Sequence, residues 1–73
     1  MTAIVALPPP ADTVTQRQLT VSINGTAQPT YIVEPDSPTT SFQLPVGFGS
    51  AMLVLQDYVN ATASPPVTLL VLG

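Results

Sequence analysis

The chain has 73 residues, a formal net charge of −3 and no cysteine or histidine. Charged residues make up 7% of the sequence, against about 25% in ordinary soluble domains, and the mean hydropathy is +0.43. These numbers exclude disulfides, thiolate or imidazole metal sites, and the basic surface that nucleic acids or anionic membranes require. We therefore expect no cofactor and no metal. A domain this small, without covalent staples and with so few charges, is expected to have other protein chains as its partners.

Residues 1–16 are predicted to form an extended arm, because three consecutive prolines favour a stiff polyproline II segment. The apolar tip before the prolines is either a frayed terminus or an anchor that docks onto a neighbouring subunit. It carries no positive charge and is too short for a signal peptide, so we expect a protein made in the cytoplasm and not exported. The predicted partner contacts of the arm are its apolar and proline residues. They are Ile4, Val5, Leu7, Pro8, Pro9 and Pro10.

A β-domain is predicted over residues 17–73. Apolar residues alternate with polar ones from Leu19 to Ile23, which is typical of a half-buried strand. The dipeptide Asn24-Gly25 then predicts a tight hairpin turn, because both central positions of a type I′ turn need a positive φ. The return strand over residues 26–34 contains a proline, which places it at a sheet edge or a bulge.

Three more strands are predicted over residues 39–44, 50–58 and 67–72, with Phe42 and Leu44 facing inward. The last two strands are apolar on both faces, as strands covered on both sides are. No segment has helical periodicity, and we find no internal repeat. The expected fold is all-β: a small antiparallel β-sandwich or partly open barrel of about five strands with an extended N-terminal arm.

The two doubly apolar strands predict more apolar surface than the domain can cover alone. Covering a second face of roughly 300–400 Å² would contribute on the order of 8–10 kcal/mol gross, most of it offset by ordering costs. Free edge strands are usually protected by lysine, and the single basic residue of this chain is Arg17. We therefore expect a homo-oligomer or a complex with another protein.

From Leu19 onward the order of segments resembles a shortened immunoglobulin-like or fibronectin type III-like domain. The similar segments are the Leu19–Gly25 hairpin, the strand around Phe42, and residues 53–64. Between their last two strands such domains often carry an aspartate, then Gly-Asn, then serine and proline. The corresponding residues of this sequence are Asp57, Asn60, Ser64 and Pro65, with Val59 where the glycine would be. The resemblance implies a structural module of a bacteriophage capsid or tail.

The residues needed for catalysis are scarce. No histidine, cysteine or lysine could activate a serine or threonine, and Asp57 is expected to cap the following turn. We therefore predict a protein that is not an enzyme. Arg17 is either a solvated strand start or an interfacial anchor, and Phe48, on a loop between glycines, is expected to be exposed. The predicted partner contacts on the domain are Arg17, Phe48 and Tyr58.

Three hypotheses for function follow. The leading one is a structural protein of a virion, a capsid decoration or cement protein that binds the capsid lattice. The alternative is a carbohydrate- or cell-surface-binding module of a tail or adhesin, with Phe48 and Tyr58 stacking on sugars. The third is a small-molecule-binding or enzymatic barrel.

Overall fold

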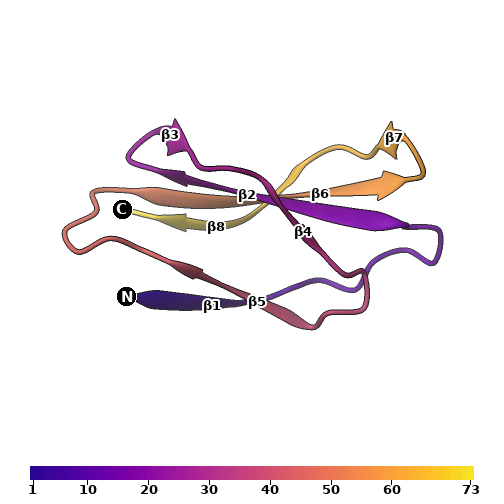
Figure 1. Cartoon of the computed structure of the whole chain (residues 1–73), viewed down its shortest axis with the longest axis horizontal. Coiled ribbons are helices and arrows are strands. Elements are labelled where there is room, and N and C mark those ends of the chain that lie inside the picture. The colour runs from indigo at the N-terminus through magenta and orange to yellow at the C-terminus, as the bar shows by residue number, and fades with distance from the viewer.

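The computed structural model describes all 73 residues and contains eight strands in two layers (Figure 1). The strands are β1 (Thr2–Ala6), β2 (Gln16–Ile23), β3 (Thr26–Ala27), β4 (Tyr31–Val33), β5 (Thr39–Gln43), β6 (Ala51–Val59), β7 (Thr62–Ala63) and β8 (Val67–Leu72). β1 and β5 form one antiparallel sheet. In the other sheet β2 and β6 pair at the centre, β3 and β4 flank β2, and β7 and β8 flank β6. The expected all-β antiparallel architecture is confirmed.

The core lies between the two sheets. On the large sheet the buried residues are the inward positions of β2 and β6. On the side of the small sheet they come from β5 and from the residues that directly follow β1 and β5. The buried apolar residues are Leu7, Leu19, Val21, Phe42, Leu44, Ala51, Leu53 and Leu55. The predicted inward directions of Phe42 and Leu44, and of the alternating residues of β2, are thereby confirmed.

The predicted hairpin after β2 is present. Asn24 and Gly25 have φ angles of 53° and 83°, and Ile23 pairs directly with Thr26 across them. Positive φ at both central positions is the signature of a type I′ turn. The return segment is split into β3 and β4 around Pro29, and both pieces lie at the edge of the sheet, as the proline indicates.

No other part of the chain covers the outer faces of the last two long strands, so the predicted second cover could come only from a partner. β6 is central, between β2 and β8, but only its inner face is covered. On its outer face Met52 is 38% exposed. β8 is an edge strand, and its far side pairs with no other strand of the chain. The apolar run of β8 therefore does not mark a central position.

The prediction of an N-terminal arm, separate from a domain that starts at residue 17, is also wrong. Residues 2–6 form β1, which is the only strand that pairs with β5. The backbone amide of Leu7 donates to the carbonyl of Pro38 at 2.9 Å, and the side chain of Leu7 is buried in the core. The physical reason is the alternation of Ala3, Val5 and Leu7, which presents an apolar face to the otherwise uncovered inner side of the large sheet.

The structure also reveals an internal repeat that we did not find in the sequence. The segment Thr2–Pro8 has a counterpart in Thr39–Pro45, which has threonine, leucine and proline at the same places. Likewise Asn24–Pro29 corresponds to Asn60–Pro65, with asparagine, threonine, alanine and proline in common. Each copy follows the same path of one separate strand, one long strand, a tight hairpin, and a final strand that returns along the long one.

The hydrogen bonds follow this repeat with two-fold symmetry. The amide of Gln28 donates to the carbonyl of Val21 at 2.7 Å, and its counterpart Ser64 donates to Asp57 at 2.8 Å. Leu19 lies directly opposite its own counterpart, Leu55. We call residues 1–36 the first half and residues 37–73 the second half. Figure 1 shows their two hairpins, at β3 and β7, at opposite ends of the large sheet.

The repeat supplies a control for the turn. Replacing Gly25 with alanine is expected to lower the free energy of unfolding by about 1–2 kcal/mol, because a Cβ is strained at a φ of 83°. No neighbouring atom lies within 4 Å of the added Cβ, so the loss would come from the backbone alone. The counterpart, Ala61, has no positive φ, and Ala61→Ser should change stability by less than about 0.5 kcal/mol. Urea unfolding of both variants checks this, and equal effects would contradict it.

Candidate contact surface

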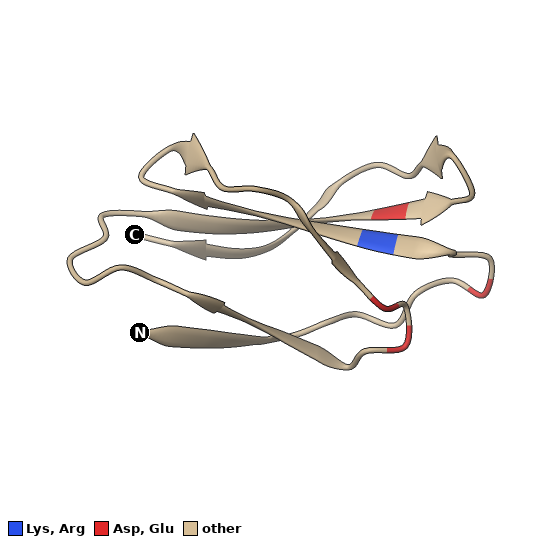
Figure 2. Ribbon diagram, viewed as in Figure 1, with Lys and Arg blue, Asp and Glu red and all other residues tan.

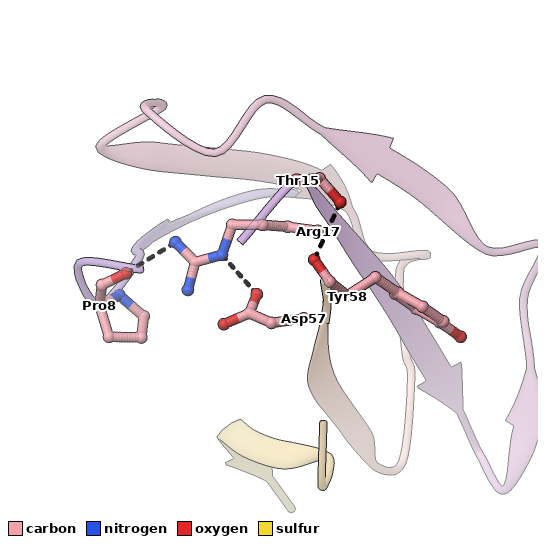
Figure 3. Close-up of polar contacts among 5 residues, drawn as sticks. All are labelled: Pro8, Thr15, Arg17, Asp57 and Tyr58. Carbon is pink, nitrogen blue, oxygen red and sulfur yellow. Dashed lines mark hydrogen bonds and ion pairs between the residues drawn. The ribbon is translucent and has the colours of Figure 1, made fainter. Parts of the chain in front are cut away.

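Arg17 is buried in the interior of the molecule. It lies on β2 two residues before the inward-facing Leu19, so both side chains point to the same face, and Arg17 is 1% exposed. Its Nε donates to Oδ1 of Asp57 on β6 at 2.7 Å, and its Nη1 donates to the carbonyl oxygen of Pro8 at 2.7 Å (Figure 3). Both sequence-based readings of Arg17, a solvated strand start and a partner contact, are therefore wrong. Its spacing from Leu19 was the signal that could have shown its inward direction.

Asp57 does not cap the following turn, which corrects the expectation for its side chain. Its carboxylate faces Arg17, where a buried guanidinium needs a charged acceptor, and its side chain is 22% exposed. The turn is held by other groups. The amide of Asn60 donates to Oγ1 of Thr15 at 2.8 Å, and the amide of Ser64 donates to the carbonyl of Asp57.

The predicted contact residues of the arm are divided between the core and the surface. Leu7 is buried, Val5 is half-buried against the core, and Ile4 is 75% exposed on the outer side of β1. Of the three prolines, the first two are exposed and the third is half-buried. Only Ile4 among the three apolar residues is open to a partner in this conformation.

Phe48 and Tyr58 do not come together. Phe48 is half-buried and packs against the core, on the loop before β6, which corrects its expected exposure. Tyr58 is half-buried near the other end of β6. At ~3.3 Å per residue the strand from Ala51 to Tyr58 covers roughly 23 Å. The two rings therefore cannot form one stacking platform for a sugar.

No family model, curated protein or solved structure matches this chain. The structure has no helix that could span a bilayer. It also has no group of three or more acidic side chains placed to hold a metal ion.

The exposed charges gather at one end of the molecule. Asp12, Glu34 and Asp36 are exposed on loops, and Figure 2 shows the charged positions on the half of the molecule where those loops lie. Two of these carboxylates, those of Asp12 and Asp36, line a hollow of about 290 Å³ together with prolines of both loops. The opposite end, with the β2–β3 turn and the C-terminus, carries no charged side chain (Figure 2).

At that end the outer positions of β6 and β8 are apolar. Met52 and Val54 on β6 point away from the core, because they alternate with the buried Leu53 and Leu55. Val71 on β8 pairs with Met52 and is 68% exposed. We call Met52, Val54 and Val71 the apolar patch.

A hollow of about 270 Å³ adjoins the apolar patch. It is lined by residues from the β2–β3 turn, the start of β6 and the end of β8. They are Ser22, Gly25, Ser50, Ala51, Met52, Val71, Leu72 and Gly73. The outer positions of the neighbouring β2 are polar but uncharged, among them Gln18, Thr20 and Ser22. The patch, the hollow and the free edge of β8 together form one surface without charged side chains at the end away from the acidic loops.

Proposed function

We propose that this chain is a non-enzymatic structural module that binds another protein through the apolar patch and the edge of β8. The context we propose is a virion, where the chain would act as a decoration or cement protein on the capsid lattice after synthesis in the host cytoplasm. The observation that supports binding is an uncharged outer sheet face, with Met52 and Val71 exposed, next to an edge strand without a partner. The virion context rests on the resemblance to small phage domains.

The edge of β8 supports a protein partner. An unpaired strand edge presents a row of backbone donors and acceptors to which another strand can add. Soluble monomers usually protect such an edge with lysine or an inward charge. β8 reads Val-Thr-Leu-Leu-Val-Leu and has neither. A partner strand or surface placed there would cover both the open backbone groups and Val71.

The use of the charged residues supports a role without catalysis. Arg17, the only basic side chain, and Asp57 bind each other between the sheets, and the guanidinium also holds Pro8. The remaining side-chain carboxylates, those of Asp12, Glu34 and Asp36, lie at the other end of the molecule from the patch. The side chains of the proposed surface are apolar, hydroxyl or amide groups, which suit packing and strand pairing rather than proton transfer.

The patch can be tested with glutamate substitutions. Met52→Glu and Val71→Glu should each weaken binding to capsid particles at least about tenfold, because the new charge would be desolvated in the contact. Val71 is 68% exposed, so Val71→Glu should change the free energy of unfolding by less than about 0.5 kcal/mol, whereas Met52 is 38% exposed on a central strand and Met52→Glu should lower it by about 1 kcal/mol. Gln16, the counterpart of Met52 in the first half, supplies the matched control, and Gln16→Glu should bind like the parent chain. Occupancy is measured by sedimentation of particles with bound chain.

Unchanged occupancy of the Met52→Glu, Val71→Glu double variant would reject the apolar patch as the contact. Binding to a glycan array that is lost on Phe48→Ala or Tyr58→Ala would instead support the carbohydrate-binding alternative. The two readouts use the same purified chain, so they distinguish the two functions directly.

A further inference from the structure

The contacts between the two halves have the form of a dimer interface. Two strand pairs join the halves, β1 with β5 and β2 with β6, and both are antiparallel. Each pairing relates counterparts by the same two-fold operation: Arg17 opposite Asp57 is repeated as Leu53 opposite Val21. An interface in which residue i meets j and j meets i is the isologous contact of a two-fold dimer.

Neither half has a core of its own. Within the first half β1 pairs with no other strand, and within the second half β5 pairs with none. The inner face of each three-stranded unit is covered only when the two halves meet, with Leu7 and Leu19 from one and Phe42 and Leu53 from the other. The stability of the fold therefore depends on the interface between the halves.

Only residues 34–38 connect the halves, between the end of β4 and the start of β5. This link is closed by a turn in which the amide of Ser37 donates to the carbonyl of Glu34 at 3.1 Å. Glu34, Asp36 and Pro38 in it are exposed. Opening the link would separate the halves without breaking any strand pair inside either half.

From this geometry we infer that a second copy of this chain is a partner for the same interface: two chains exchange halves and form a domain-swapped dimer. In that dimer the first half of each chain pairs with the second half of the other, and every contact of the monomer is reproduced twice. Such an exchange costs little, because only the link changes conformation. In the free chain the short link keeps the two halves at an effective concentration in the millimolar range, which favours the contact within one chain over exchange between chains. Exchange is therefore favoured when the link is too short to reverse direction and bring the two halves of the same chain together.

The buried ion pair determines which halves combine. Its two partners come from different halves, Arg17 from the first and Asp57 from the second. Pairing two first halves would place each Arg17 opposite Val21, and pairing two second halves would place each Asp57 opposite Leu53. Either arrangement would bury charges without partners, which is strongly unfavourable. The swapped dimer is therefore expected to contain only first-with-second pairs.

Shortening the link is the first test. Deleting Pro35, Asp36 and Ser37 leaves two residues between strands that lie in different layers, and it removes the turn. The shortened chain should elute as a dimer with slightly less than twice the 7.6 kDa mass of the parent, while inserting three glycines after Asp36 should leave a monomer. Light scattering measures both. A folded monomer from the shortened chain would overturn the inference.

Charge exchange in the shortened chain is the second test, and it separates swapping from pairing at sheet edges. Arg17→Asp gives a chain with an acidic residue at both positions 17 and 57, and Asp57→Arg gives a chain with a basic residue at both positions. Each alone should lose most of its dimer, whereas refolding them together should yield a mixed dimer with a melting temperature within a few degrees of that of the shortened parent. Native mass spectrometry identifies the mixed species. Edge pairing could not relieve the like charges within each chain, so the absence of mixed dimers would reject the exchange of halves.

Discussion

Replacing Asp57 with valine is expected to lower the free energy of unfolding by about 3–5 kcal/mol, because it leaves a buried guanidinium without its carboxylate. Arg17 is 1% exposed and would keep only the carbonyl of Pro8 as a partner. Arg17→Leu should lower the free energy of unfolding by less, since the side chain of Asp57 is 22% exposed and its carboxylate can turn toward water. Small domains have a total stability of roughly 5–15 kcal/mol, so the valine variant should be close to unfolding. Urea unfolding at neutral pH measures both.

The internal repeat provides the compensating double variant. At the symmetry-related place of the large sheet the Arg17–Asp57 pair is replaced by Leu53 and Val21, which the chain already packs there. Arg17→Leu combined with Asp57→Val should therefore regain most of the loss, because well-packed apolar residues often replace a buried ion pair at no net cost. A double variant as unstable as Asp57→Val alone would show that the site needs the polar contact with Pro8 itself.

Deleting residues 1–10 is the second change with a large expected effect, and we expect it to abolish folding. The deletion removes β1, the only strand that pairs with β5, and it removes the buried Leu7. β5 would then have no strand on either side, and the inner face of the large sheet would lose part of its cover. The shortened chain should show no cooperative thermal transition by circular dichroism.

A point substitution separates this packing role from chain length. Leu7→Ala should lower the free energy of unfolding by about 2–5 kcal/mol, as for other buried leucines. Ile4→Ala, on the same strand but 75% exposed, should change stability by less than about 0.5 kcal/mol. A cooperative transition after deletion of residues 1–10 would contradict the packing role of β1 and Leu7, and it would support a separate arm.

Local patterns predicted the parts of the fold that local physics decides. Alternation gave the inward residues of β2, and the Asn24-Gly25 dipeptide gave the turn that starts the return strand. Pro29 correctly placed that strand at an edge. Each of these follows from the chemistry of one residue and its immediate neighbours.

The missed features depend on residues far apart in the sequence. The prolines after Leu7 indicated an arm, but the alternation before them could be recognised as a strand only with β5 as its partner. The charge of Arg17 predicted an exposed side chain, because the sequence does not show that Asp57 lies directly opposite it on β6. The repeat was hidden because its copies share only turn residues and a few threonines, leucines and prolines, while the strands between them differ. The doubly apolar sequence of residues 50–58 correctly indicated an apolar outer face on β6, but the edge position of β8 was not anticipated.

Because the strand pairs β1–β5 and β2–β6 join the first half of the chain to the second, the order of synthesis sets when this protein can fold. Thr2 can pair only after Gln43 has been synthesised, and Gln16 can pair with β6 only after Tyr58 has been synthesised. Topologies dominated by such distant pairs fold slowly, in milliseconds to seconds. A ribosome will therefore have released most of the chain before its first strand finds a neighbour, and the apolar strands stay exposed to the cell for that interval. The vulnerable state of this molecule is the nascent one.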